Sequence, residues 1–214
     1  MTRGPARAVV FDMDGVLVDS GAHHRDAWRA MFQDLGVTPP TEFWRVTIGR
    51  PADEAVALLV DVDRVEARRL AEMKRRHYAR LARRGAVPVA GIPAFVDALV
   101  RERVPRAVAT SATRRDVERV LEELGLASRF DVVVTADDVR WGKPNPEVYL
   151  KAAAGLAVDP SACVVFEDAV VGVQAARAAG MRVIGVTSAH TDEELVRAGA
   201  ERAVASFEGV RWPV

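Results

Sequence analysis

Short apolar runs alternate with stretches of helical periodicity along most of the chain. The first run, Ala8–Phe11, combines β-branched and aromatic residues, which is typical of a strand buried on both faces of a parallel sheet. Alternating strands and helices of this length predict an α/β fold with a doubly wound, Rossmann-like parallel sheet and right-handed crossovers. We expect further strands over 107–110, 131–135, 163–166, 182–186 and 203–205, and helices over 94–102, 115–124, 146–154, 172–179 and from Thr191 onward.

The alternation stops between residues 21 and 87, where the apolar positions follow helical spacing only. Residues 88–93 contain a glycine and two prolines and predict a linker back to the alternating pattern. The chain is therefore expected to fold as an α/β core, residues 1–20 and 88–214, with an inserted all-helical domain. The helices expected in the insert span residues 22–35, 52–60 and 64–84.

Composition narrows the functional classes. The chain has 214 residues with 30 basic and 30 acidic side chains, so no net charge favours nucleic acid or an anionic membrane. No run approaches the roughly 20 apolar residues of a membrane span, and the first residues lack the apolar core of a signal peptide. The single cysteine, Cys163, cannot form an internal disulfide and lies in an apolar run. We predict a cytoplasmic protein, a monomer or weak homodimer, that binds neither nucleic acid nor membrane.

Two acidic residues follow the first strand directly. Asp12 and Asp14 are two positions apart, so on an extended chain their side chains share a face, with Cα atoms roughly 6.6 Å apart. Gly15 then allows a sharp turn. Like charges so close are costly unless a cation, a shared proton or a polarised substrate is present, which indicates a Mg²⁺ site or acid–base chemistry. Such a turn alone is equally compatible with a simple end to a strand.

A hydroxyl residue ends the second predicted strand, where a helix follows. Ser111 and the backbone amide of Ala112 lie near the start of that helix, whose unpaired N–H groups and partial positive charge suit a phosphate. Thr110 is expected to turn away, because successive side chains on a strand point to opposite faces. A simple Ser or Thr helix cap is the alternative explanation of this pattern.

Lys143 and two further acids complete the set of polar residues near strand ends. Lys143 is one of three lysines and lies between Gly142 and Pro144, so a point cation fixed there would neutralise carboxylate and phosphoryl oxygens. Glu167 and Asp168 follow the fourth predicted strand without a basic neighbour nearby in sequence, which indicates a site for a hard cation. Because ligands bind at the carboxyl ends of parallel strands, all these residues are expected at one edge of the sheet.

These segments, taken in order, resemble the four motifs of the haloacid dehalogenase superfamily. Residues 11–20 read Phe-Asp-Met-Asp-Gly-Val-Leu-Val-Asp-Ser and resemble the first motif of its phosphatases and phosphomutases. Ser111 matches the second motif, Gly-Lys-Pro-Asn-Pro at 142–146 resembles the third, and Glu167 with Asp168 resembles the fourth. The resemblance covers essentially the whole chain and implies the phosphatase or β-phosphoglucomutase-like branch, which has a helical cap.

The resemblance also implies a reaction. Asp12 would attack phosphorus and form an aspartyl-phosphate, while Asp14 would protonate the leaving oxygen and later activate water. Lys143, Ser111 and the Ala112 amide would bind the transferred phosphoryl group and stabilise its charge. An acid at Asp14 favours phosphate esters over haloacids, because an alkoxide leaving group needs a proton and a halide does not.

Mg²⁺ is the cofactor that the resemblance implies. Asp12, the backbone carbonyl of Asp14 and the Asp168 carboxylate would be its ligands, and Glu167 would reach it through water. Bound there, the cation would reduce the repulsion between the nucleophile and the phosphate.

The helical insert resembles the mobile cap that closes over the site in this superfamily and excludes water. Candidate substrate contacts on or beside the insert are Ser20, His24, Arg50 and Lys74. His24 matches a position that faces the site in the sugar-phosphate branch, and Lys74 matches a cap lysine that contacts a second anionic group there. An ordinary helix position is the alternative explanation of His24.

One departure from the family pattern bears on the reaction. β-Phosphoglucomutase-like members have an Arg three positions after the Gly of the cap's substrate loop, where this chain has Ala52 after Gly49, with Arg50 adjacent. This difference favours hydrolysis, and we predict a Mg²⁺-dependent phosphomonoesterase acting on a small phosphorylated metabolite of the sugar phosphate or phosphoglycolate type. A phosphosugar mutase is the alternative within the family. A catalytically silent binding or regulatory protein on the same scaffold is the alternative from another class.

Overall fold

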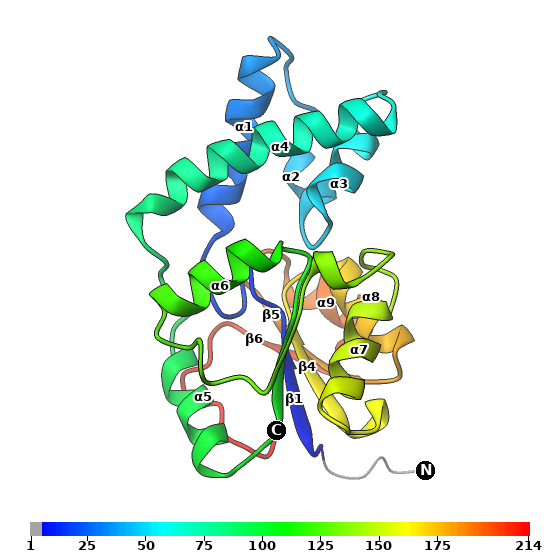
Figure 1. Ribbon diagram of the computed structural model, residues 1–214. Coiled ribbons are helices and arrows are strands. Elements are labelled where there is room, and N and C mark those ends of the chain that lie inside the picture. Colours follow the sequence, from blue (N-terminus) through cyan, green and yellow to red (C-terminus); the bar gives the residue numbers. More distant parts are fainter. Residues whose placement is uncertain (1–5) are drawn as a thin grey trace.

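A six-stranded sheet forms the centre of the protein, for which a computed structural model describes residues 6–214 (Figure 1). Neighbouring strands pair in parallel in the order β3-β2-β1-β4-β5-β6, so the chain winds outward from β1 in both directions. The predicted α/β fold with a doubly wound, Rossmann-like sheet is confirmed. The strands are β1 (Ala8–Phe11), β2 (Arg106–Ala109), β3 (Val132–Val134), β4 (Cys163–Glu167), β5 (Arg182–Val186) and β6 (Arg202–Val204).

Helices cover both faces of the sheet. One face packs against α5 (Ile92–Arg101) and α6 (Arg114–Glu123), and the other against α7 (Glu147–Gly155), α8 (Val170–Ala178) and α9 (Asp192–Ala198). Alternate residues of β1 pack on opposite faces of the sheet. Val9 belongs to the apolar cluster with α5 and α6, and Val10 to the cluster with α7, α8 and α9. Burial on both faces is the reason why this strand is a continuous apolar run.

A stacked aromatic pair fixes the two central strands just before their polar ends. Phe11 of β1 lies directly opposite Phe166 of β4, with ring centroids 5.5 Å apart and an interplanar angle of 12°. Asp12 follows Phe11 and Glu167 follows Phe166 directly in the sequence, and the Asp12 N–H donates to the Phe166 carbonyl at 3.0 Å. The apolar pair therefore sets the register that places two acids side by side at the carboxyl edge of the sheet.

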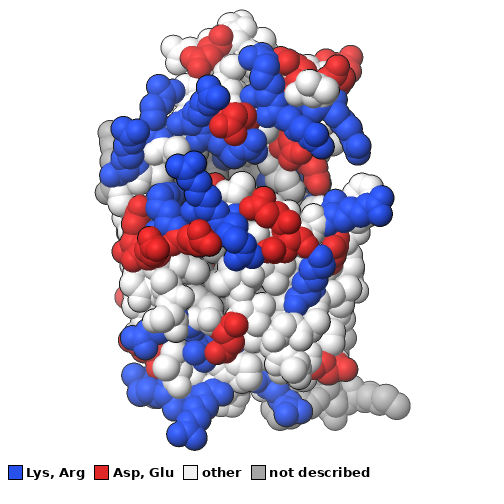
Figure 2. Space-filling model, in the orientation of Figure 1, with Lys and Arg blue, Asp and Glu red and all other residues white. Residues whose placement is uncertain are grey.

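The inserted residues form a helical cap over that edge (Figure 1). Its helices are α1 (Gly21–Asp34), α2 (Phe43–Thr47), α3 (Ala52–Leu59) and α4 (Arg64–Leu81). They pack around an apolar cluster of their own that includes Trp28, Phe43 and Leu70. Figure 2 shows Lys and Arg side chains gathered over the cap on this face, and α4 alone carries seven Lys or Arg against two Glu. A chain without net charge thus has a basic cap.

Three helical segments differ from the sequence prediction. The pattern does not predict α2, because Phe43 is its only buried residue and five residues are too few to show a helical period. Helix α5 begins at Ile92 rather than at residue 94 and includes Pro93 in its first turn, where a missing N–H leaves no hydrogen bond unmade. The last turn expected of α4 is a separate 3₁₀ turn, Ala82–Arg84.

The two connections between core and cap lie side by side. Val18 and Pro88 form an isolated bridge, and the Asp19 N–H donates to the Val87 carbonyl at 2.8 Å. The boundaries predicted for the core and the insert stay a prediction, and residues 1–5 of the predicted core lie outside the described residues. Within residues 6–214, none of the helices combines the length and apolar character needed to cross a lipid bilayer.

Candidate active site

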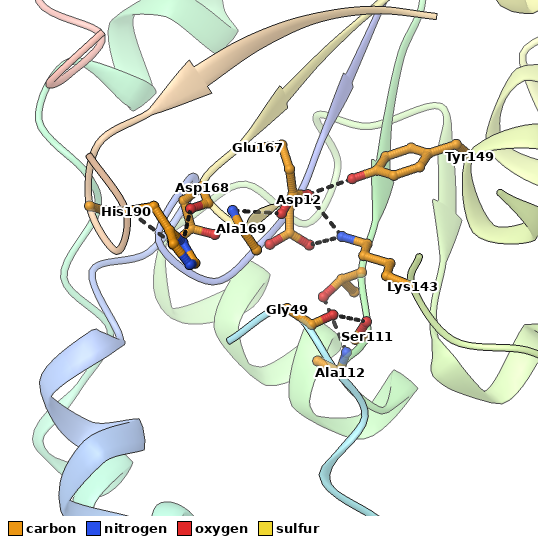
Figure 3. A network of polar contacts seen from close by, with 12 residues as sticks. Asp12, Gly49, Ser111, Ala112, Lys143, Tyr149, Glu167, Asp168, Ala169 and His190 are labelled. Carbon is orange, nitrogen blue, oxygen red and sulfur yellow. Dashed lines mark hydrogen bonds and ion pairs between the residues drawn. The ribbon is translucent and has the colours of Figure 1, made fainter. Parts of the chain in front are cut away.

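The carboxyl ends of the central strands bring the predicted polar residues together (Figure 3). Asp12 follows β1, Ser111 lies two residues beyond β2, and Glu167 is the last residue of β4 with Asp168 next to it. Asp12, Glu167 and Asp168 are all buried. Parallel strands end at one edge, so residues far apart in sequence meet in a small volume.

Lys143 joins two of these acids. Its Nζ donates to Asp12 Oδ1 and to Glu167 Oε2, both at 2.9 Å, and only 1% of the residue is exposed. Burial alone would lower the pKa of Lys143, but the charges of Asp12 and Glu167 raise it well above its usual value. The basic partner that Glu167 lacks nearby in sequence is thus supplied from another segment, as a fixed positive charge beside Asp12.

One lysine does not balance the acids around it. The carboxylates of Asp12, Glu167 and Asp168 offer oxygen atoms that all lie within 4.8 Å of one another. Burial, with the charge of Glu167, raises the pKa of Asp12 to about 7, and burial with the charges of Glu167 and Asp12 raises the pKa of Asp168 well above its usual value. Excess negative charge on an all-oxygen donor set suits a hard divalent cation, so these residues fit a metal site.

The turn after β1 is shaped to admit Asp168. Gly15 has a φ of +74°, and a Cβ atom there would come within 1.9 Å of Asp168 Oδ2, so only glycine permits this approach. Ser188 donates to the same Oδ2 at 2.9 Å, and Nδ1 of His190 lies 2.9 Å from the Asp168 carbonyl oxygen. Ser188 and His190 are missing from the sequence prediction, although their position just after a buried strand, β5, is a signal of the kind used for the other residues.

Asp14 begins a chain of polar contacts that reaches into the cap. Its Oδ1 accepts from Ser20 Oγ at 2.5 Å and lies 3.1 Å from His24 Nε2, while Lys74 Nζ lies 2.7 Å from His24 Nδ1. Because an ammonium can only donate, Nδ1 is the acceptor and Nε2 carries the proton that is donated to Asp14. Lys74 lies over the rings of Trp28 and Tyr78, 5.4 and 5.1 Å from their centroids.

These contacts determine the pKa values of Asp14, His24 and Lys74. Burial would raise the pKa of Asp14, but the contact with His24 and the hydrogen bond from Ser20, together with the charge of Lys74, lower it to about 2. Burial and the charge of Lys74 lower the pKa of His24, and burial lowers the pKa of Lys74 to about 8. In the free protein Asp14 is therefore an anion beside a neutral imidazole.

The residues expected to bind phosphate have partners within the protein. Ser111 Oγ donates to the Gly49 carbonyl of the cap at 2.9 Å, and the Ala112 N–H donates to Thr110 Oγ1 at 3.2 Å. The sequence places Thr110 away from the site, but it lies at the same cavity as Ser111 and Ala112. Binding of an anion by Ser111 or the Ala112 amide therefore replaces an existing hydrogen bond.

A single cavity between core and cap gathers most of the predicted site residues. Trp28, Trp44, Ile48 and Tyr78 of the cap provide its apolar wall. Lys143 and Glu167 are buried next to the cavity, beside Asp12. The predicted residues that line the cavity are Asp12, Asp14, Ser20, His24, Arg50, Lys74, Ser111, Ala112 and Asp168.

A doubly wound, Rossmann-like sheet with a helical cap over its carboxyl edge and buried acids beneath that cap defines the class of capped α/β enzymes whose site lies between core and cap. The sequence profile of the haloacid dehalogenase-like hydrolase family matches residues 9–186, and this chain belongs to that family. Within the family it is similar to β-phosphoglucomutase-like phosphatases, and it is a phosphatase.

Relatives cover nearly the whole chain. A validoxylamine A 7'-phosphate phosphatase from Streptomyces hygroscopicus subsp. limoneus is 39% identical over 97% of both chains. A phosphorylated carbohydrates phosphatase from Thermotoga maritima is 35% identical over 90% of this chain and 91% of its own. Among solved structures, a β-phosphoglucomutase from Clostridium difficile has a TM-score of 0.85 at 27% identity, covering 97% of this chain and 94% of its own.

Proposed function

We propose that this phosphatase hydrolyses small sugar phosphates with the help of Mg²⁺, through a phosphorylated intermediate on Asp12. The position of Asp12 carries the proposal. Its carboxylate lines the cavity, and Lys143 holds Oδ1 at 2.9 Å, which leaves Oδ2 as the atom to attack phosphorus. An ionised carboxylate held in this way is a usable nucleophile, and its phosphate ester can be hydrolysed in a second step.

Two steps complete the reaction. In the first, a bond forms between Asp12 Oδ2 and phosphorus, the ester P–O bond breaks, and the leaving oxygen takes a proton from Asp14. In the second, Asp14 takes a proton from water while the water oxygen attacks phosphorus, which releases phosphate and restores Asp12. Lys143 and Ser111 stabilise the charge on the transferred group in both steps.

Asp14 must change its protonation state between these steps. Its pKa of about 2 in the free protein keeps Asp14 ionised, so it can accept the proton in the second step. A phosphate group bound next to Asp14 raises this pKa, because a nearby negative charge disfavours ionisation, and it can also displace the donors Ser20 and His24. Substrate binding thus prepares Asp14 to act as the acid of the first step.

The metal site would be formed by the buried acids. Asp12 and Asp168 would hold Mg²⁺, with Glu167 acting through water and the Asp14 carbonyl as a further ligand. When bound, the ion supplies positive charge that reduces repulsion between carboxylate and phosphate. The excess of carboxylates over Lys143 in this cluster supports a divalent cation as the cofactor.

Three features support a sugar phosphate as substrate. The names of two relatives, a validoxylamine phosphate phosphatase and a phosphorylated carbohydrates phosphatase, indicate phosphorylated carbohydrate-like substrates for those proteins. In this chain, Trp28 and Trp44 line the cavity, and indole rings pack well against the C–H face of a sugar ring. The basic cap adds a field that attracts a phosphorylated ligand.

Phosphate release from a panel of phosphate esters, measured with Mg²⁺ and with EDTA, tests the proposal. We expect turnover of at least one sugar phosphate with Mg²⁺, loss of that turnover with EDTA, and none in Asp12→Asn, whose amide cannot attack phosphorus. Turnover of Asp12→Asn at the wild-type rate would refute the nucleophile, and inactivity of the wild type on every ester would refute the phosphatase assignment.

A phosphosugar mutase is the second candidate, favoured by the overall likeness to β-phosphoglucomutase. The mutase assignment is disfavoured by Ala52, which stands at the position where those enzymes have an Arg. A requirement for added hexose 1,6-bisphosphate, together with no release of inorganic phosphate, would establish the mutase. A cytoplasmic location and a monomeric or weakly dimeric state remain predictions.

A further inference from the structure

Tyr149 contacts the buried cluster of Asp12, Lys143 and Glu167, although no sequence motif points to it. The residue lies on α7 and is completely buried. Its hydroxyl donates to Glu167 Oε2 at 2.5 Å, and Figure 3 shows it on the side of Glu167 that faces Lys143. A buried tyrosine whose O–H is directed at a buried carboxylate does more than fill space in the core.

Glu167 is held from several directions. Oε2 accepts from both Tyr149 and Lys143, while Oε1 accepts from the Ala169 N–H at 3.1 Å. A Cβ atom at Gly172 would come within 2.1 Å of the Glu167 carboxyl group, so the carboxylate lies directly against the backbone of α8. With its three donors, this side chain has little freedom to rotate.

The same contacts define the direction of the Lys143 ammonium. Two of its three N–H groups are used by Asp12 and Glu167, and the ring of Tyr149 lies 5.0 Å from Nζ. One N–H therefore remains for a phosphoryl oxygen. If Glu167 Oε2 lost the donor from Tyr149, Lys143 would become its only donor, and the lysine would be drawn toward Glu167 and away from Asp12.

We propose that Tyr149 is a positioning residue, whose hydroxyl fixes Glu167 for the metal site and so keeps Lys143 directed at Asp12. The inference rests on the proposed function for its effect on turnover, and on the metal site within that proposal, but not on turnover, for its effect on Mg²⁺ binding. Groups that orient metal ligands and their neighbours commonly change metal affinity or activity by about 10- to 100-fold when removed.

Tyr149→Phe removes the hydroxyl and keeps the ring. We expect Mg²⁺ to bind the substrate-free variant about tenfold more weakly by calorimetry, and kcat to fall about tenfold, with KM for the phosphate ester within twofold of wild type. Val148→Ala is the matched control, because it shortens another buried side chain of α7. It should lower the melting temperature and leave Mg²⁺ affinity unchanged.

A second pair of variants separates positioning from packing. In a Glu167→Ala background Tyr149 has no carboxylate to hold, so adding Tyr149→Phe should change kcat by less than twofold. The inference is overturned if Tyr149→Phe retains both Mg²⁺ affinity and kcat within twofold of wild type, or if its effect is equally large without Glu167. Failure of the proposed function would look different, because the wild type would then release no phosphate. The Mg²⁺ affinities of wild type and Tyr149→Phe could still be compared by calorimetry.

Discussion

The metal-free protein is expected to lose stability as the pH rises from 5 to 8. Burial, with the charge of Glu167, raises the pKa of Asp12 from 3.8 to about 7 in the folded state. Between these two values the folded protein holds a proton that the unfolded chain has released, so the free energy of unfolding falls as the pH rises through about 7. The two pKa values correspond to about 4 kcal/mol over the whole range, of which roughly 2–3 kcal/mol falls between pH 5 and 8.

Urea unfolding with EDTA, followed by circular dichroism at pH 5, 6, 7 and 8, measures this effect. Asp12→Asn is the matched control, because the amide keeps the shape of the side chain and removes its titration. The difference in unfolding free energy between wild type and variant should change by about 2–3 kcal/mol, and the contributions of titrating groups remote from Asp12 cancel.

Mg²⁺ should reverse the loss. Above pH 7 it should stabilise wild type more than Asp12→Asn, because the cation compensates the carboxylate that the variant lacks. A difference between the two proteins that stays constant with pH, or that changes in the opposite direction, would refute the argument from buried carboxylates.

Three other variants test the lysine, the polar chain and the apolar wall. Lys143→Met should lower kcat at saturating Mg²⁺ by about 100-fold or more, because charge on the transferred group is no longer stabilised, and a loss of less than tenfold would contradict this. His24→Ala removes a donor that holds Asp14 as an anion, so the pKa of Asp14 should rise from about 2. The acid limb of the pH profile for phosphoenzyme hydrolysis, in which Asp14 is the base, should then move to higher pH, and an unmoved limb would count against the contact. Trp44→Ala should raise KM for cyclic sugar phosphates about tenfold and leave KM for glycerol phosphate within twofold of wild type. Val46→Ala, at an exposed position on the same helix, is the control, and equal effects of Trp44→Ala on both esters would exclude ring packing.

Local sequence patterns predict the parts of the site that lie at strand ends. Phe11 and Asp12 are adjacent, so the apolar run that forms β1 also determines where the acid stands, and the same is true of Phe166 and Glu167. In these places the secondary structure and the chemistry depend on the same few residues. The sheet order then brings the strand ends together by general rules of α/β topology.

Contacts that depend on tertiary structure leave no such pattern. Tyr149 has the appearance of an ordinary core residue of α7, and its partner Glu167 lies 18 positions later. His24 and Lys74 are 50 positions apart, on helices whose packing no periodicity specifies. Helix α2 is likewise too short to be predicted, since it is held by the burial of Phe43 in the cap rather than by a pattern of its own.

The hydrogen bond from Ser111 to the Gly49 carbonyl has a thermodynamic consequence. A serine hydroxyl has one proton, and here that proton is already donated across the boundary between core and cap at 2.9 Å. It cannot be donated to a phosphoryl oxygen at the same time, so an arriving anion competes with the Gly49 loop for one donor. Anion affinity and loop placement are therefore reciprocally coupled: the loop contact lowers the affinity of Ser111 for the anion, and a bound anion weakens the loop contact by the same factor.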